Sequence, residues 1–279
     1  MAMSIRTNVA SLNAQRNLYA TQTALDSSLS RLSSGYRITK AGDDAAGLGI
    51  STKLESQIRS YGQAIRNAND GLSVIQSTES ALNESANILT RLRELAMQSS
   101  SDGIGASERA YVNTESTALL TELQRISQVT NYNGAQLLDG TNASGLDFQV
   151  GIANSASGFD AIHFSTLDAT TGASGLNVSG LDLSSKASAL AALSTLDSAL
   201  AAVSKNRADL GAAGNRLQSA INNIQAFSES LSAANSRIKD VDVAEETSKM
   251  ARSQILMQAG VSVLAQANQM PQLALKLLG

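Results

Sequence analysis

Apolar residues recur every three or four positions over two long stretches of the chain. The first stretch steps through Leu54, Ile58, Tyr61, Ile65, Ala68, Leu72, Ile75, Glu79, Leu82, Ala86 and Leu89. The second steps through Ala189, Leu193, Leu196, Leu200, Val203, Arg207, Leu210, Gly214, Leu217, Ile221, Ile224, Ser228, Leu231, Asn235 and Ile238. Heptad spacing sustained over such lengths predicts two long helices that pack in a bundle or coiled coil.

Polar residues mark the ends of these two helices. Asp43 and Asp44 precede the first series and suit a helix start, because carboxylates stabilise helix N-termini. The pattern breaks after Ser99. One unbroken helix over 185–238 would run ~80 Å, whereas a compact domain of this length has a diameter near ~50 Å. We therefore expect either a rod or a broken helix, with 212–214 as the break.

Three shorter amphipathic helices complete the prediction. An N-terminal helix ends at Gly35, which suits a C-terminal cap. Another spans about 107–130. The last begins after Asp242 and ends near Met270, because Pro271 disfavours helix at the residue before it. The apolar positions of the first and last helices are Ile5, Val9, Leu12, Leu25, Leu29, Leu32, Met250, Met257, Val261 and Leu264.

The middle of the chain has a different pattern. Turn-forming residues occur at 132–134 and 139–140, and apolar residues alternate like short strands at 146–150 and 161–164. Gly, Ser, Thr and Asn dominate 140–185, which we interpret as a loop-rich surface with one or two hairpins. The predicted fold class is mainly α, an elongated antiparallel bundle or coiled coil of long helices with a small β-hairpin region in the middle of the chain.

Two parts of the chain are expected from this organisation. The terminal helices, 1–43 and 239–279, can pair with each other. Residues 44–238 form a rod-like helical domain that includes the hairpin and loop region at 132–185. Isolated terminal helices of this kind are marginal in water. We therefore expect them to be disordered in the free monomer and to fold on association.

Composition removes most kinds of chemistry. The 279 residues include no Cys and one His, so no disulfide, thiol nucleophile or His-rich metal site is expected. The chain has no second His and no Cys that could form a catalytic or metal site with His163. The acidic pairs 43–44 and 245–246 are interpreted as carboxylates that cap helices. No phosphate-binding, dinucleotide or hydrolase motif occurs. We predict no enzyme activity, no cofactor and no metal.

Charge and hydropathy argue against two further partners. The net charge is −3 and the basic residues do not cluster, which disfavours nucleic acid. The segment 253–275 carries no charged residue, but its many Gln and Asn side chains argue against a membrane helix. The first twenty residues have no continuous apolar core, so no cleavable secretory signal is predicted.

One face of the last helix is polar yet uncharged. It consists of Gln254, Gln258, Ser262, Gln266 and Gln269, which are spaced by four, four, four and three positions. Two interpretations stay open from the residues alone. The face is either simply solvated, or it lines a water-filled channel whose wall must not bind charged cargo tightly.

Several separate motifs closely resemble those of bacterial flagellins. At the N-terminal end they are MSIRTN at 3–8, LNAQ at 12–15, LSRLSSGYRI at 29–38 and GDDAAGL at 42–48. At the C-terminal end they are AANSRIKDVD at 233–242 and ANQMPQ at 267–272. The motifs occur in the order of the family, and the resemblance covers roughly 1–140 and 186–279. Only 140–185 stands where many flagellins carry large outer domains, so the chain resembles a minimal flagellin.

The resemblance implies a subunit of the extracellular bacterial flagellar filament, a helical homopolymer used for motility. In that family the terminal helices pair into an inner tube around the export channel, and the long helices form a surrounding shell. The channel interpretation of the polar face at 254–269 then becomes the favoured one. The ten apolar positions of the terminal helices become the assembly core. Export unfolded through the flagellar type III apparatus is also implied, followed by folding at the tip.

The resemblance also implies partners. Besides other copies of the chain, they are the flagellar cap and hook-junction proteins, and an export chaperone that binds the C-terminal segment at about 243–279. Residues 89–98 resemble the segment by which many flagellins engage Toll-like receptor 5. Arg91 and Leu95 match its key positions, and Glu115 on the next helix matches a third.

Three alternatives compete with a filament subunit. A hook–filament junction protein of the same family shares the terminal helices. An exported enzyme on a flagellin-like scaffold would need motifs that 140–185 lacks. A monomeric coiled-coil binding module would fold without assembling.

Overall fold

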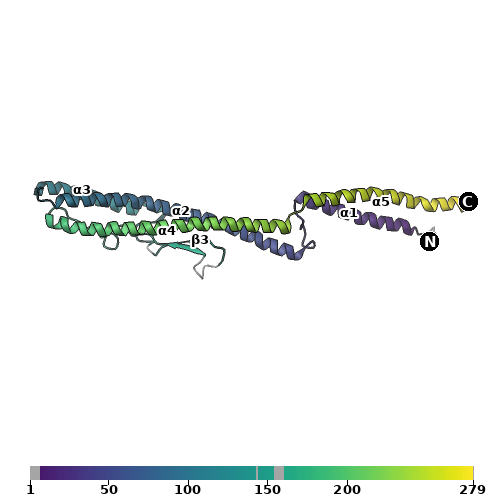
Figure 1. Ribbon diagram of the computed structural model, residues 1–279, viewed down its shortest axis with the longest axis horizontal. Helices are drawn as coiled ribbons and strands as arrows, with labels where there is room; N and C mark the ends of the chain where they lie inside the picture. Colours follow the sequence, from purple (N-terminus) through teal and green to yellow (C-terminus); the bar gives the residue numbers. More distant parts are fainter. Residues whose placement is uncertain (1–6, 143, 154–159, 279) are drawn as a thin grey trace. The chain divides into compact units, whose positions relative to one another are not determined.

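The computed structural model describes residues 7–142, 144–153 and 160–278 of the chain. Its elements are α1 (Val9–Ser34), α2 (Ala45–Ser99), α3 (Ala106–Val129), β1 (Asn131–Tyr132), β2 (Ala135–Gln136), β3 (Leu146–Gln149), β4 (Ala161–Phe164), α4 (Lys186–Lys239) and α5 (Val243–Leu278), shown in Figure 1. The chain forms two compact units: residues 1–58 with 229–279, and residues 59–228. Long antiparallel helices with small two-stranded sheets in mid-chain confirm the predicted fold class.

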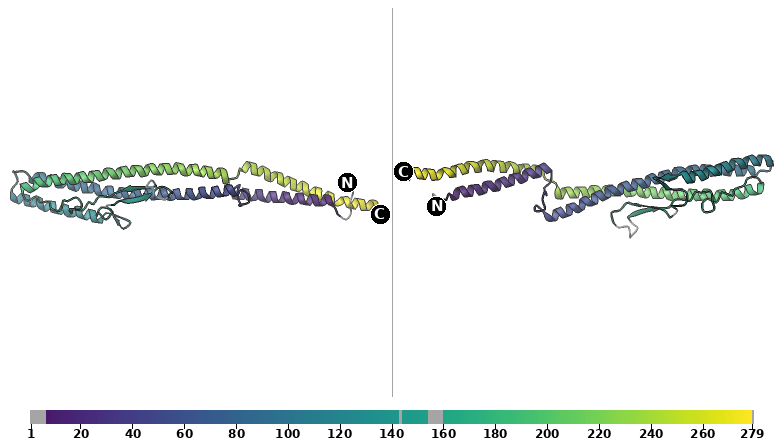
Figure 2. Two further views of the ribbon diagram at one scale, coloured as in Figure 1. Left: turned by 90° about the horizontal axis from the view of Figure 1, so that it is seen from below. Right: turned by 180° about the vertical axis from the view of Figure 1, so that it is seen from behind.

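In the unit formed by 59–228, α2 and α4 run antiparallel with α3 beside them (Figures 1 and 2). Arg93 Nε lies 2.6 Å from Asp197 Oδ1, and Glu79 pairs with Arg207 further along. Leucines of the heptad series pack in the core between the helices. The fully buried leucines of this core include Leu82, Leu89, Leu92, Leu95, Leu123, Leu196, Leu210 and Leu217.

The charged positions that interrupt the two heptad series lie opposite each other. Glu79 is the one polar member of the first series, and its Oε1 lies 3.9 Å from Arg207 Nη2 of the second. Both side chains are partly exposed at the edge of the helix seam. The neighbouring Asn206 is buried and donates its Nδ2 to the Ser165 carbonyl at 3.4 Å. Polar residues in an apolar seam favour one register over others.

Of the one or two hairpins predicted, two antiparallel strand pairs are present. β1 and β2 pair around Asn133 and Gly134, whose φ angles of 50° and 83° belong to the left-handed region that Asn-Gly tolerates. β3 and β4 pair antiparallel with Leu146 opposite Phe164. The Phe148 and Phe164 rings stack with their centroids 5.4 Å apart. This stacking adds aromatic area to the side of the core.

The segment after β4 is more than surface loop, which differs from the expectation. Ala169, Leu176, Val178 and Leu183 are buried in the same core as the helices. Helix side chains hold the segment in place: Gln124 Oε1 accepts from the Thr171 amide at 2.9 Å, and Asn113 Oδ1 accepts from the Leu183 amide at 2.9 Å. The sequence does not predict this burial, because the apolar residues of the segment stand among small and hydroxyl residues and are spaced like neither a helix nor a strand.

In the other unit, α1 and α5 pack side by side and antiparallel (Figure 2). The Asn8 side chain donates from Nδ2 to the Ala267 carbonyl at 2.8 Å, whereas Arg31 lies near Glu246 at the opposite end of the pair. Apart from Thr247, the less exposed residues among the described side chains of α5 are spaced by four and three positions: Glu246, Met250, Ser253, Met257, Gly260, Leu264 and Ala267. This spacing identifies a coiled-coil seam between the two helices.

Of the two alternatives for 185–238, the structure has the unbroken helix. α4 continues without interruption through 212–214, because one Gly in a long packed helix costs only about 1 kcal/mol. One prediction about a helix limit is wrong. α5 does not end near Met270 but extends to Leu278. The steric effect of Pro271 on the preceding residue is a preference, which helix on both sides outweighs. The other limits are close to prediction, including the Gly35 cap, whose amide donates to the Arg31 carbonyl.

Among the described residues, one helix has a window long and apolar enough to cross a membrane by composition. That helix is α4. Core helices pass the same test, and the apolar side of α4 within 186–228 packs into the buried core. The observation therefore gives only weak evidence for a membrane span.

Replacing Gly71 of α2 with alanine is expected to lower the free energy of unfolding by about 1–3 kcal/mol. A Cβ at this position would lie 2.9 Å from Phe148 Cγ and 3.2 Å from Leu217 Cδ1. Gly62, on the same helix, has no atom within 4 Å of such a Cβ. G62A is therefore the matched control and should stabilise by about 0.5–1 kcal/mol through helix propensity. Urea unfolding measures both, and equal effects would contradict the packing argument.

Candidate functional site

The predicted assembly residues of the terminal helices fall into two groups. Leu25, Leu32, Met250, Met257 and Leu264 are half-buried, and the α5 members lie on the seam with α1. Val9, Leu12, Leu29 and Val261 are exposed on the single chain. Ile5 lies outside the described residues. The first group therefore contributes to pairing within one chain, and the second remains available to other molecules.

Further apolar side chains lie on the outside of the same helix pair. They are Tyr19 on α1 and Val243, Ile255, Leu256 and Val263 on α5. Single exposed apolar residues are ordinary on protein surfaces. Here they recur along two paired helices whose unit has few buried residues of its own. Repeated apolar exposure of this kind marks interaction surfaces.

The polar face of α5 is separate from its seam with α1. Gln254, Gln258, Ser262, Gln266 and Gln269 are all exposed, and none belongs to the seam. The Ser262 hydroxyl donates to the Gln258 carbonyl of its own helix at 3.1 Å, which turns this group toward the backbone. The face therefore presents neutral amides with no formal charge.

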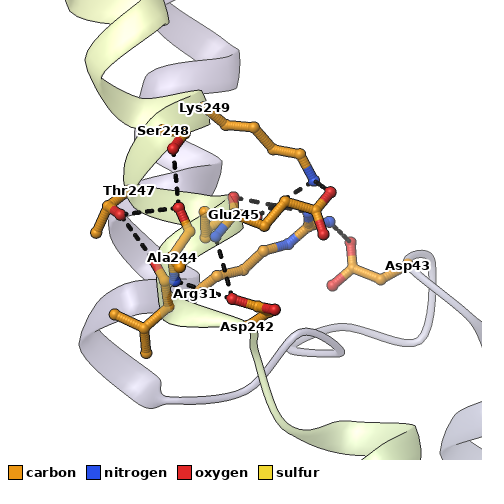
Figure 3. A network of polar contacts seen from close by, with 10 residues as sticks. Arg31, Asp43, Asp242, Ala244, Glu245, Thr247, Ser248 and Lys249 are labelled. Carbon is orange, nitrogen blue, oxygen red and sulfur yellow. Dashed lines mark hydrogen bonds and ion pairs between the residues drawn. The ribbon is translucent and has the colours of Figure 1, made fainter.

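Charged residues join the two helices where α1 ends and α5 begins (Figure 3). Arg31 lies in the last turn of α1, with Nη1 3.9 Å from Glu246 Oε1 and Nη2 3.8 Å from Asp43 Oδ1. Lys249 lies 2.8 Å from Glu245 and 3.7 Å from buried Glu246. The hydrogen bond to Glu245 raises the pKa of Lys249 above its ordinary value.

The carboxylates at the two helix starts have different roles from one another. Asp44 caps α2, because its Oδ1 accepts from the Gly47 amide at 2.8 Å. Asp43 instead organises the preceding loop and accepts from the Thr39 and Lys40 amides, each at 3.0 Å. These backbone hydrogen bonds lower the pKa of Asp43 below its ordinary value. Asp242 caps α5 by accepting from the Ala244 and Glu245 amides.

The segment that follows α1 is also hydrogen-bonded to the segment that joins α4 to α5. The Arg37 amide donates to the Lys239 carbonyl at 2.7 Å, and the Val241 amide donates to the Gly35 carbonyl at 3.0 Å. Lys239 Nζ lies 4.5 Å from the centre of the Tyr36 ring and bonds Glu55, which raises its pKa. Main-chain pairing and a cation over an aromatic ring hold both segments at the base of the α1–α5 pair.

The three predicted receptor residues lie near one another but differ in exposure. Arg91 donates from Nε and Nη2 to Glu115 Oε1 at 3.0 and 2.8 Å, and both side chains are about half exposed. Glu94 is a second partner of Arg91, with its Oε2 3.1 Å from Arg91 Nη1. The hydrogen bond to Glu115 raises the pKa of Arg91. Leu95 is 1% exposed, so its side chain supports the helix from the core instead of offering a contact surface.

The described residues contain no group of three or more His, Asp or Glu side chains that could hold a metal ion. His163 Nδ1 lies 2.9 Å from Asp147 on the facing strand, and both side chains are exposed. Such a pair is an ordinary cross-strand contact. The features that stand out among the described residues are long paired helices with exposed apolar side chains and one uncharged polar face.

Comparison with known families identifies the class. Residues 5–143 match the bacterial flagellin N-terminal helical region, and residues 193–278 match the bacterial flagellin C-terminal helical region. The chain belongs to the bacterial flagellin family. It is a structural, non-enzymatic subunit of the extracellular flagellar filament used for motility. The family thereby decides against the exported-enzyme alternative.

Similar proteins agree over the whole chain. It is 42% identical over 276 residues to the flagellin of Halalkalibacterium halodurans, covering 99% of this chain and 100% of that protein. It is 41% identical over 305 residues to the flagellin of Bacillus subtilis, with the same coverage. The alignment with flagellin B of Vibrio cholerae runs over 376 residues at 35% identity and covers both chains fully, so that protein carries residues this chain lacks.

The fold is also similar to that of solved structures. One of them is a putative flagellar hook-associated protein from Vibrio parahaemolyticus, with a TM-score of 0.60 and 16% identity, covering 71% of this chain and 100% of that chain. Identity at this level indicates a shared fold alone. The filament assignment rests on the family models and the whole-chain relatives.

Proposed function

We propose that the α1–α5 pair is the part of each subunit that forms the inner core of the filament. The observation that carries the proposal is the exposure of apolar side chains along both helices outside their shared seam, Leu12, Leu29 and Val261 among them. Apolar surface of this kind is stabilised when another copy covers it. A contact between different faces of identical subunits that does not close gives a helix, which suits a filament.

The polar face of α5 is assigned to the channel side of this core. Gln254, Gln258, Gln266 and Gln269 present neutral amides, which bind passing unfolded chains weakly because they carry no charge. The same helix exposes apolar residues that serve an export chaperone before assembly. Covering 243–279 in this way would keep copies from associating before export, and the chain would travel unfolded. Cap and hook-junction proteins are the further partners expected at the ends of the filament.

Folding on assembly is tested by circular dichroism of monomer and filament at equal concentration. α1 and α5 contain 26 and 36 residues. If both form only on association, helix content should rise by an amount comparable to these two helices when the filament forms. A variant lacking both terminal segments supplies the baseline for the remaining helices. Equal helix content in monomer and filament would refute coupled folding.

A second function is proposed for the surface around Arg91: recognition of the monomer by Toll-like receptor 5. Support comes from the two hydrogen bonds that Arg91 donates to Glu115 Oε1, which hold a partly exposed guanidinium on the surface of α2 and α3. Arginine is enriched among residues that dominate interfaces. Leu95 contributes by holding this part of α2 in the core. The same surface is expected to be covered when subunits pack together.

Arg91→Ala is expected to weaken receptor signalling by the monomer about tenfold or more, since loss of an interface arginine costs upward of 1–2 kcal/mol. Arg125→Ala is the matched control, because Arg125 forms an equally exposed pair with Glu122 on α3. Loss of either exposed pair should change folding stability by less than about 1 kcal/mol. A cell reporter assay compares them, and unchanged signalling by R91A would contradict the assignment.

A further inference from the structure

The turn that joins β1 to β2 places an asparagine directly before a glycine. Asn133 is the one asparagine of the chain that a glycine follows. Asn133 and Gly134 have φ angles of 50° and 83°, and both residues are exposed. A left-handed turn of this kind is typical of Asn-Gly at the tip of a hairpin. The turn lies outside the helix surfaces proposed for assembly and for the receptor.

Neither amide of the turn is engaged elsewhere. The Asn133 side chain and the Gly134 backbone nitrogen make no hydrogen bond with the part of the chain that the structure describes. A Cβ at Gly134 would meet no atom within 4 Å, so the surrounding space is open. Glycine also has no side chain that shields its nitrogen or restricts its rotation. The Gly134 nitrogen is therefore free to approach the side-chain carbonyl carbon of Asn133.

The hairpin that carries this turn is short. β1 and β2 each contribute two residues to the pairing. Strand pairs of this length are marginal by themselves and open locally at little cost. Opening matters because the attack requires the Asn133 backbone to rotate out of the turn geometry. Firm anchoring begins only after β2, where the Leu137 amide donates to the Thr130 carbonyl at 3.0 Å.

We propose that Asn133 is a site of spontaneous deamidation, through a cyclic imide formed with the Gly134 nitrogen. This nitrogen loses its proton and bonds to the side-chain carbonyl carbon of Asn133, and ammonia leaves. Water then opens the imide at one of its two carbonyl carbons. Cleavage at the side-chain carbonyl gives aspartate, and cleavage at the main-chain carbonyl gives isoaspartate. Both products carry a carboxylate in place of a neutral amide, and the reaction needs only water.

Isoaspartate changes the backbone as well as the charge. Its main chain runs through the former side-chain carbon and is longer by a methylene group. A two-residue turn with both residues left-handed does not accommodate this insertion, so the pairing of Tyr132 with Ala135 is lost. The hairpin leads directly into Leu137 and Leu138, which are buried in the core. Isoaspartate at this turn therefore loosens one side of the unit of 59–228, to an extent that increases with the age of the chain.

Incubation of the full-length chain at mildly alkaline pH, followed by peptide mass spectrometry, tests the proposal. Asn177 is the matched internal control, because it is also exposed and has a φ of 54°. The next residue, Val178, is fully buried and donates its amide to the Thr171 carbonyl at 2.9 Å. A β-branched side chain also shields that nitrogen. We expect Asn133 to convert about tenfold or more faster than Asn177, and to convert faster as the pH rises, because the attacking nitrogen must lose its proton.

Two further measurements test the route and its consequence. Electron-transfer fragmentation distinguishes isoaspartate from aspartate, and an imide intermediate must give both. N133D, incubated in parallel, adds the same charge without lengthening the backbone. We expect the converted chain to unfold at a lower urea midpoint than N133D.

Conversion of Asn133 no faster than that of Asn177, or a product without isoaspartate, would overturn the inference. Equal urea midpoints of the converted chain and N133D would overturn the loss of strand pairing. Neither result bears on the inner-core proposal, because this turn belongs to the unit of 59–228.

Discussion

Replacing Leu29 with aspartate is expected to abolish filament formation while leaving the monomer folded as before. Leu29 is 58% exposed on α1, so a carboxylate at this position stays hydrated in the free chain. In the proposed inner core the same position is covered by another copy. Burying a leucine contributes about 1.5–3 kcal/mol, and an unpaired buried carboxylate costs several more. Since about 1.4 kcal/mol corresponds to tenfold in association, the critical concentration should rise beyond the usual assembly range.

Sedimentation and electron microscopy measure the L29D effect, with circular dichroism checking the monomer. Ser30→Asp is the matched control, because Ser30 is also exposed and adjacent on α1. It adds the same charge to the same helical turn without removing an apolar contact. S30D should therefore assemble at a much lower concentration than L29D. Filaments of L29D at the concentration needed by the unchanged chain would show that α1 meets no other copy at this face.

The long helices were predictable because the heptad spacing is simple and sustained. Side chains that repeat every three or four residues lie on one face, and burial of Leu82, Leu89, Leu196 and Leu210 confirms it. The pairing of Glu79 with Arg207 was not predicted. Both residues stood in the two series as interruptions, yet their relation needs the register of one helix against the other. Local periodicity carries no information about register between segments so far apart.

Burial after β4 was missed for a different reason. Ala169, Leu176, Val178 and Leu183 have no helical or strand spacing, because the backbone there is irregular. Its backbone hydrogen bonds are made mostly within the segment, as from the Leu176 amide to the Thr170 carbonyl at 2.9 Å, and a few go to helix side chains, as from the Thr171 amide to Gln124. A segment whose backbone groups are satisfied by turns and by helix side chains packs into a core without a periodic pattern of its own. Composition alone then resembles that of an exposed loop.

The candidate site was predictable in kind but not in detail. Helical periodicity identified apolar residues on the terminal helices, but it could not separate Leu25 on the inner side from Leu29 on the outer side. The reason is that the α1 seam also contains small and polar residues, Ser11 and Ser28 among them, which are the buried ones. Glu246 was expected to cap a helix, and its burial beside Arg31 depends on α1 lying against α5.

Leu92→Ala is expected to destabilise the unit of 59–228 by about 2–5 kcal/mol. Leu92 is 0% exposed in α2, and its neighbours Leu89, Leu95 and Ala96 are buried in the same core. Truncation removes transfer free energy and leaves a cavity that rigid helices on both sides fill poorly. A loss of this size is a large fraction of the stability of an ordinary domain. Urea unfolding followed by circular dichroism measures it as a lower midpoint at unchanged slope.

The control for L92A is another leucine on the same bundle. Leu190 on α4 is 52% exposed, so Leu190→Ala removes the same atoms from a position that is already half in water. Its effect should stay within about 0.5–1 kcal/mol. Because Leu92 adjoins Arg91, comparing L92A with Leu190→Ala also separates a loss of folding stability from a loss of receptor recognition. If L92A signals weakly only at temperatures where it unfolds, the core acts by holding the surface. Equal destabilisation by both variants would mean that α2 is not anchored at Leu92.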